Sequence, residues 1–177
     1  MRNTQVRFGF TAVVAVLMCL PAWAAVVYVT PSGAGSAADG TSWGNALAGT
    51  ALSGAIGNAA AGTEFWVAAG SYLPSASTSF TFTLKTGVSL YGGFAGNETS
   101  RDQRNISGNI TVLSGDLNGN NTADAGDCTT VVTATNITNT TLDGFSIMYG
   151  YAVGGWGVGL NCCRAAMPHR PMQKLCA

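Results

Sequence analysis

The chain has 177 residues, enough for one ordinary domain, and 9% of them are Asp, Glu, Lys or Arg, against roughly 25% in a typical soluble domain. Eight acidic and eight basic residues balance to a net charge of zero, which excludes the basic surface that a nucleic-acid partner requires. Apolar residues make up 47% of the chain, which excludes a disordered linker.

Residues 1–24 have the three parts of an export signal peptide. Arg2 and Arg7 supply the positive charge at the start, the apolar run FGFTAVVAVLMCL follows, and the tripeptide AWA fits a cleavage site. The apolar run is shorter than the roughly 20 residues that a transmembrane anchor needs. We therefore expect an exported chain whose mature form begins near Ala25.

Residues 25–62 are predicted to form a strand followed by a helix that caps the fold. The run VVYVT at Val26–Thr30 is typical of a strand. From residue 43 to residue 60, apolar side chains recur at helical spacing after two residues that favour helix starts, Thr41 and Ser42. Four glycines in this stretch oppose a helix: Gly44, Gly49, Gly54 and Gly57.

Residues 63–160 contain short segments in which apolar and polar residues alternate, the pattern of half-buried strands. Three apolar pairs are predicted to point into the core: Phe65 and Val67, Phe82 and Leu84, and Val88 and Leu90. The dipeptide Asp143-Gly144 divides a later segment into two short strands. Because glycine permits a sharp bend, we expect a corner there.

The spacing of these segments suggests a repeat. One apolar anchor per segment, taken at Val67, Leu90, Val112 and Val132, recurs at nearly equal intervals along the chain. Short strands and turn residues at such a period favour a β-solenoid, whose coils stack at about 4.8 Å. The periodicity leaves a β-sandwich open as the alternative, since sandwich strands recur about every 8–12 residues.

Five segments occur in a characteristic order: YVTPSGAGSAADGTSWGNAL, EFWVAAGSYLP, GVSLYGGFAGNETSRDQRN, TVLSGDLNGN and TLDGFSIMYG. Together they resemble the N-terminal region of bacterial secreted right-handed parallel β-helix proteins. These proteins belong to the pectin-lyase-like superfamily and include polymorphic outer-membrane-type surface proteins.

The resemblance implies an all-β fold, a right-handed parallel β-helix of about four or five coils over residues 63–160, with the short helix as an N-terminal cap. It also implies a secreted or cell-surface setting. It is less specific for activity, because such domains serve as adhesins, surface stalks and polysaccharide lyases or hydrolases.

The loop DLNGNNTADAGD spaces oxygen-bearing side chains as a calcium loop does. Five residues occupy positions 1, 3, 5, 9 and 12 of this twelve-residue stretch: Asp116, Asn118, Asn120, Asp124 and Asp127. The match is partial, because position 6 is Asn121 where glycine is expected and position 12 is not Glu. A structural calcium ion and a long polar turn between coils are the two interpretations.

The segment ETSRDQRN gathers four charged residues in a chain that has few: Glu98, Arg101, Asp102 and Arg104. The resemblance to lyases implies a basic residue that removes a proton beside a sugar carboxylate, and Arg101 or Arg104 would be that residue. The alternative is a solvated loop held by its own ion pairs and turn hydrogen bonds. No motif in the sequence reproduces a lyase active site, so no catalytic residue is assigned.

Aromatic side chains form a third group, because exposed rings stack on the apolar faces of sugars. The candidates for such platforms are Trp66, Tyr72, Tyr91, Tyr149, Tyr151 and Trp156. Ordinary packing beneath a surface loop is the alternative for each of them.

The texture of the sequence changes in the tail, residues 161–177. Three cysteines, two prolines and three basic residues appear there, and proline opposes strand formation. One interpretation is a frameshifted or truncated chain, which would leave the end of the solenoid uncovered and prone to self-association. The other is a genuine cap closed by a disulfide from Cys162 or Cys163 to Cys176.

These observations favour an exported, non-catalytic module of a secreted or surface protein, adhesin-like or in contact with carbohydrate. The expected partner is a polysaccharide or a host or cell-surface glycan. Membrane contact is expected through export or anchoring of the full-length protein, and nucleic acid is not expected. The rival function is that of a fragment of a polysaccharide lyase or glycoside hydrolase.

Overall fold

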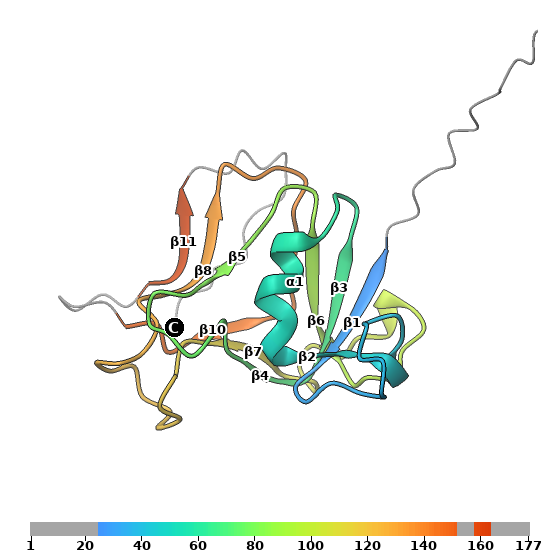
Figure 1. The fold of residues 1–177 in the computed structure, drawn as a ribbon, viewed down its shortest axis with the longest axis horizontal. Coiled ribbons are helices and arrows are strands. Elements are labelled where there is room, and N and C mark those ends of the chain that lie inside the picture. Colours follow the sequence, from blue (N-terminus) through green and yellow to red (C-terminus); the bar gives the residue numbers. More distant parts are fainter. Residues whose placement is uncertain (1–24, 152–157, 164–177) are drawn as a thin grey trace, which may run out of the picture.

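The structure, a computed structural model, describes residues 25–151 and 158–163 (Figure 1). Within these ranges lie the strands β1 (Val26–Thr30), β2 (Leu47–Ala48), β3 (Glu64–Ala68), β4 (Gly70–Tyr72), β5 (Phe82–Thr83), β6 (Ser89–Phe94), β7 (Thr111–Ser114), β8 (Thr130–Thr135), β9 (Leu142–Asp143), β10 (Ser146–Met148) and β11 (Val158–Cys163). They also contain the α-helix α1 (Leu52–Asn58) and the 3-10 helices η1 (Trp43–Asn45), η2 (Gly49–Ala51) and η3 (Arg101–Gln103). The described fold is therefore mostly strands, with one short α-helix.

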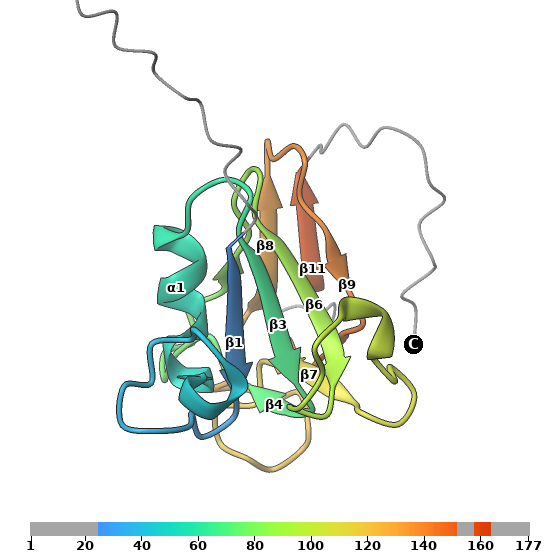
Figure 2. The ribbon, with the colours of Figure 1, turned by 90° about the vertical axis from the view of Figure 1, so that its right-hand side faces the viewer.

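The strands form three small parallel sheets. Sheet A has the order β2-β1-β3-β6-β9, sheet B the order β10-β7-β4, and sheet C the order β11-β8-β5. Every pairing between these strands is parallel. From β3 onward the chain passes through sheets A, B and C in that order three times. Figure 2 shows β1, β3 and β6 of sheet A side by side, with α1 next to β1.

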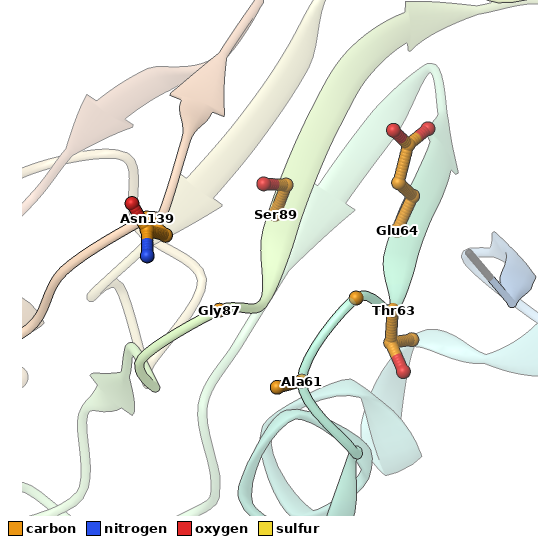
Figure 3. Close-up of a pocket in the computed structure, with 7 residues that line it drawn as sticks. Ala61, Thr63, Glu64, Gly87, Ser89 and Asn139 are labelled. Carbon is orange, nitrogen blue, oxygen red and sulfur yellow. The ribbon is translucent and has the colours of Figure 1, made fainter. Parts of the chain in front are cut away.

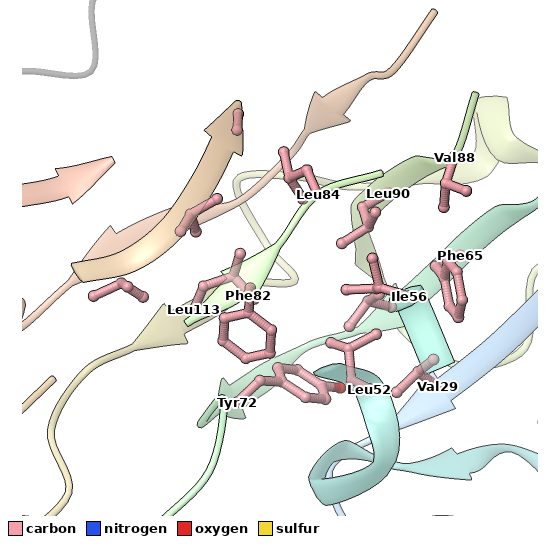
Figure 4. Packing of buried hydrophobic residues seen from close by; sticks show 14 of the residues in the cluster. Val29, Leu52, Ile56, Phe65, Tyr72, Phe82, Leu84, Val88, Leu90 and Leu113 are labelled. Carbon is pink, nitrogen blue, oxygen red and sulfur yellow. The ribbon is translucent and has the colours of Figure 1, made fainter. Parts of the chain in front are cut away.

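One apolar core lies between the three sheets and α1 (Figure 4). Its largest fully buried side chains come from all four elements: Val29, Phe65, Val67 and Leu90 of sheet A, Tyr72 and Leu113 of sheet B, Phe82 and Val131 of sheet C, and Leu52 and Ile56 of α1. Burial of each such side chain contributes about 1.5–3 kcal/mol to the free energy of folding, relative to leaving it exposed. The predicted inward positions of the three apolar pairs in residues 65–90 are confirmed.

The N-terminal segment contains a shorter helix than the sequence predicts. The expected helix at residues 43–60 is instead η1, β2, η2 and the seven-residue α1. Gly49, in η2, packs closely against the core, because a Cβ atom at this position would lie 2.7 Å from a ring carbon of Tyr72. Within α1, Leu52 and Ile56 are one turn apart and both are buried. Lys85 closes the helix by donating to the carbonyls of Gly57 and Ala59 at 3.0 and 2.7 Å.

The predicted even repeat is wrong as a description of how the strands stack. Of the four anchors, Val67 and Leu90 lie in sheet A, Val112 in sheet B and Val132 in sheet C. In sheet A, Leu90 on β6 has two register partners, Phe65 on β3 and Leu142 on β9. The sequence interval from Leu90 to Leu142 is about twice the interval from Phe65 to Leu90. Successive turns of the chain therefore differ in length, because loops of different size leave the sheets.

The predicted corner at Asp143-Gly144 is confirmed. It joins β9 of sheet A to β10 of sheet B, and Gly144 has a φ of 79°. A Cβ atom on Gly144 would lie 2.6 Å from the carbonyl oxygen of Gly92, so the close approach of two turns of chain requires glycine.

Both predicted end segments fall largely outside the described residues. The export signal expected at 1–24 lies outside them, as do residues 164–177 of the tail. β11, which ends at Cys163, crosses the boundary expected at residue 160 and pairs with β8 over its length. Among the described residues, no helix has the length and apolar character needed to cross a membrane.

Candidate functional site

The outer face of sheet A carries a packed group of aromatic rings, called here the outer aromatic cluster: Tyr28, Trp43, Trp66, Tyr91 and Phe94. Trp66 and Tyr91 are register partners on β3 and β6. The rings of Trp66 and Phe94 stack with centroids 4.9 Å apart, and Tyr28 meets Trp43 edge to face at 4.8 Å. This arrangement stabilises the outer side of the sheet.

Three of the six aromatic residues predicted as sugar platforms are buried. Trp66 is 7% exposed, Tyr91 9% and Tyr72 1%, so the prediction that these rings are exposed is wrong. The hydroxyl of Tyr72 donates to the carbonyl of Ala68 at 2.8 Å inside the core. Tyr149 and Tyr151 are half-buried, and Trp156 lies outside the described residues.

Two arginines from the predicted charged segment cover the ring of Tyr91. The guanidinium of Arg101 lies 4.5 Å from the ring centroid and that of Arg104 lies 5.2 Å from it. Arg101 also pairs with Glu64 at 3.1 Å, and Arg104 pairs with Asp143 at 2.9 Å. Both side chains thus serve as cations in packing contacts.

Arg104 makes further contacts with the backbone. It donates to the carbonyl of Gly92 at 3.2 Å and to that of Arg101 at 3.1 Å, and 14% of its side chain is exposed. These contacts give both arginines a structural role, and the segment has the expected turn hydrogen bonds. Its ion pairs, however, run to Glu64 and Asp143 of sheet A, so the expectation that the loop is held by its own ion pairs is wrong. A guanidinium with this many partners is poorly placed to remove a proton from a substrate.

The turn before η3 is organised around Glu98, whose side chain is buried. Its carboxylate accepts backbone N–H groups of Ala95, Gly96 and Asn97 at 2.6, 3.0 and 3.1 Å. Burial raises the pKa of Glu98, but the backbone hydrogen bonds outweigh burial and the net pKa is lowered. The indole of Trp43 donates to the Glu98 carbonyl at 2.9 Å, which ties this turn to the outer aromatic cluster.

The predicted calcium residues lie in the loop between β7 and β8, and the structure brings them together. Asp116 accepts the backbone N–H groups of Gly119, Asn120 and Asn121 at 2.7, 3.1 and 2.8 Å. Such bonds to a carboxylate are among the stronger hydrogen bonds in proteins. Asp116 therefore acts as the organising residue of the first half of the loop.

The second half of the loop is held in the same way. Asp127 accepts the backbone N–H groups of Leu117 and Asp124, both at 3.0 Å. The side-chain amides of Asn118 and Asn120 donate to the carboxylate of Asp124. The residues present are oxygen-rich and fit calcium in donor type. Yet the loop closes through hydrogen bonds, and no group of three His, Cys, Asp or Glu side chains among the described residues has a metal-holding arrangement. The calcium site stays a prediction.

Cys128 is the cysteine whose side chain the structure describes, and it is buried and free. Burial, and to a smaller extent the neighbouring charge of Asp127, raise the pKa of its thiol. The predicted disulfide from Cys162 or Cys163 to Cys176 lies outside the described side chains.

The sequence did not identify an open hollow of about 400 Å³ at the amino-terminal end of sheet A (Figure 3). Its polar side chains are Thr63, Glu64, Ser89 and Asn139. Glu64 and Ser89 begin β3 and β6 and are register partners, so both belong to the outer face of the sheet. Figure 3 shows Ser89 between Glu64 and Asn139.

The floor of this hollow is a column of left-handed residues. Gly62, Gly87 and Asn139 have φ values of 91°, 75° and 53°, and each precedes a strand of sheet A. The N–H of Gly62 donates to the Gly87 carbonyl at 2.7 Å, and that of Gly87 donates to the Thr138 carbonyl at 2.9 Å. The sequence signal for this feature was a Gly or Asn shortly before each of these strands, because these residues tolerate the left-handed region of backbone conformation.

No family model, no curated protein and no solved structure matches this chain. A function must therefore be argued from the geometry of the chain itself.

Proposed function

We propose that this protein is an exported, non-catalytic right-handed parallel β-helix module of a secreted or cell-surface protein, and that it contacts carbohydrate. The observation that carries the proposal is the passage of the chain through three parallel sheets in one fixed order, three times over. Connections between parallel strands are almost always right-handed, which supports the handedness. The resemblance of residues 27–155 to bacterial surface β-helix proteins agrees with this arrangement.

The non-catalytic role is supported by the contacts of the charged side chains. Arg101 and Arg104, the residues expected to act in a lyase, are engaged by Glu64, Asp143 and the ring of Tyr91. Lys85, the remaining cation of the described residues, is bound to carbonyls at the end of α1. A structural role accounts for each of these contacts.

Carbohydrate contact is supported by the hollow at the amino-terminal end of sheet A. A hydroxyl, an amide and a carboxylate from Ser89, Asn139 and Glu64 line one open depression. Sites that hold a polyhydroxylated ligand need several such donors and acceptors on one surface. The expected partner is a polysaccharide or a glycan of a host or cell surface.

Export is supported by the sequence of residues 1–24, with Arg2 and Arg7 before an apolar run and an A-x-A site. The corresponding test is the N-terminal sequence of the protein recovered from culture medium or from the cell surface. We expect that sequence to begin near Ala25.

Incubation with polysaccharides separates the proposed module from the rival lyase or hydrolase. We expect retention of the protein on immobilised polysaccharide without any release of new reducing ends or unsaturated sugars. Depolymerisation that disappears in Arg101→Ala or Arg104→Ala would establish the rival function and overturn the proposal.

A further inference from the structure

The hollow at the amino-terminal end of sheet A has polar groups and one charged group. Of the residues that line it, Glu64 is the one that ionises, and the others are Ala61, Gly62, Thr63, Gly87, Ser89 and Asn139. Among the described residues, a ligand in the hollow would meet hydroxyl, amide and carboxylate groups and no lining cation.

The charge of Glu64 is already balanced. One carboxylate oxygen accepts from Arg101 at 3.1 Å and the other accepts from the indole of Trp66 at 3.1 Å. A carboxylate has about four acceptor positions, so Glu64 keeps the capacity to accept hydroxyl donors. An anionic ligand would be repelled by this carboxylate. The neighbouring cation, Arg101, is already paired with Glu64 and would not offset that repulsion.

Asn139 adds an amide on the side of Ser89 away from Glu64 (Figure 3). It is exposed and its φ of 53° places it in the left-handed region. The side-chain amide offers both donors and an acceptor, which suits the paired donor and acceptor character of a sugar hydroxyl. Ser89 lies on the adjacent strand, where its backbone N–H is fixed by the Thr63 carbonyl at 3.0 Å.

We infer that this hollow binds an uncharged, hydroxyl-rich ligand, a neutral saccharide rather than an acidic one. The inference rests on the proposed function and adds the class of glycan and the place where it binds. Ser89 and Asn139 would supply hydroxyl and amide contacts, and Glu64 would accept from sugar hydroxyls while Arg101 holds its carboxylate in place.

Asn139→Gly is the most informative variant, because glycine adopts a positive φ without strain and removes the side chain alone. Asn136→Gly is the matched control, since Asn136 is also exposed, with a φ of 52°, and does not line the hollow. Ser89→Ala is a second variant that removes one hydroxyl. Affinity electrophoresis of the whole chain would use neutral polysaccharides (dextran, mannan, β-glucan) and acidic ones (polygalacturonate, alginate, hyaluronan).

We expect at least one neutral polysaccharide to retard the protein and the acidic ones to retard it less. Asn139→Gly and Ser89→Ala should each weaken that binding by about three- to tenfold, the effect of one lost hydrogen bond, and Asn136→Gly should leave it unchanged. Stronger retardation by acidic polysaccharides would overturn the inference and leave carbohydrate contact standing. Equal binding by all variants would also overturn it, since the ligand would then lie elsewhere. Retardation by none of the six would overturn the proposed carbohydrate contact itself.

Discussion

The guanidinium of Arg104 donates to the carboxylate of Asp143 at 2.9 Å, across 39 residues of sequence. Arg104 belongs to the loop after β6, and Asp143 ends β9, the next strand of sheet A. The same guanidinium donates to the carbonyl of Gly92 in β6. One side chain therefore ties two successive strands of the sheet together from outside.

Arg104→Ala should lower the free energy of unfolding by about 1–3 kcal/mol, because it removes the ion pair with Asp143 and the hydrogen bond to the Gly92 carbonyl. Arg101→Ala is the matched control, since it also removes a guanidinium above Tyr91 but from a side chain that is 41% exposed rather than 14%. Its effect should stay below about 1 kcal/mol. Urea unfolding of both variants measures the difference. Equal losses of stability would contradict the conclusion that Arg104 ties β6 to β9.

Phe82→Ala should lower the free energy of unfolding by about 3–5 kcal/mol, because the ring fills the core between sheet C and α1. Phe80 lies two residues earlier and is 52% exposed, against 0% for Phe82. Phe80→Ala should therefore change stability by less than about 0.5 kcal/mol. Thermal unfolding followed by circular dichroism tests the pair. A large loss from Phe80→Ala would mean that the ring of Phe80 packs against the protein instead of facing solvent.

Gly144→Ala should cost about 2 kcal/mol or more, because alanine disfavours the φ of 79° and its methyl group would meet the Gly92 carbonyl. Gly54→Ala is the opposite case. Gly54 is exposed within α1 and a Cβ atom there has no neighbour within 4 Å. Alanine should therefore raise the stability by about 0.5–1 kcal/mol. Chemical unfolding of both variants should give changes of opposite sign, and changes of the same sign would count against the corner.

Protonation of Glu98 should destabilise the protein at low pH. The pKa of its carboxyl is lowered from 4.5 in the folded protein, so its stabilising effect is fully present above that pH and is lost as the pH falls through the folded pKa. Glu98→Gln should be less stable than the parent at neutral pH, and the difference should close as the solution is acidified. Unfolding free energies measured from pH 7 to about pH 3 test this. A difference that stays constant with pH would show that the charge of Glu98 does not matter.

The loop between β7 and β8 gives a direct test of the predicted calcium ion. Since Asp116 and Asp127 already accept backbone N–H groups, we expect the melting temperature in calcium to exceed that in EGTA by less than about 1 °C. Asp116→Ala should lower stability by about 1–3 kcal/mol in either buffer, because the N–H groups of Gly119 and Asn121 lose their acceptor, whereas that of Asn120 keeps Asn118. A calcium-dependent rise of several degrees that Asp124→Asn abolishes would establish the ion site.

The alternation of apolar residues was enough to predict which strand residues face the core. Phe82 and Leu84 show this, because alternation along a strand depends on local geometry alone. The same reasoning could not predict the burial of Trp66 and Tyr91. Their outward direction followed from the alternation, but Tyr91 is covered by Arg101 and Arg104 and Trp66 packs against Tyr28 and Phe94, contacts that alternation does not predict.

The helix and the repeat were mispredicted for a related reason. Apolar spacing around Leu52 and Ile56 correctly indicated a helix, yet the residues before Leu52 form η1, β2 and η2, and the pairing of β2 with β1 is a tertiary contact that the spacing does not reveal. The interval between stacked residues, such as Leu90 and Leu142, includes whole surface loops. Because loop length is independent of the core, an anchor spacing taken along the sequence does not give the stacking register. The hollow was missed since it joins residues from three separate turns of chain.

Stacked partners on neighbouring strands are separated by unequal lengths of sequence. The strands must therefore be kept, whereas the loops between them are free to vary in length. Phe65, Leu90 and Leu142 stay aligned although the second interval along the sequence is about twice the first. An excursion between sheets can therefore be lengthened without moving the strands on either side, because closing a longer loop costs little. The loop after β6 is an exception to exchange, since its Arg104 ties β6 to β9. Grafting a foreign peptide into the segment between β7 and β8 would display it at a fixed position on an unaltered set of sheets, which makes this chain a scaffold whose surface is set loop by loop.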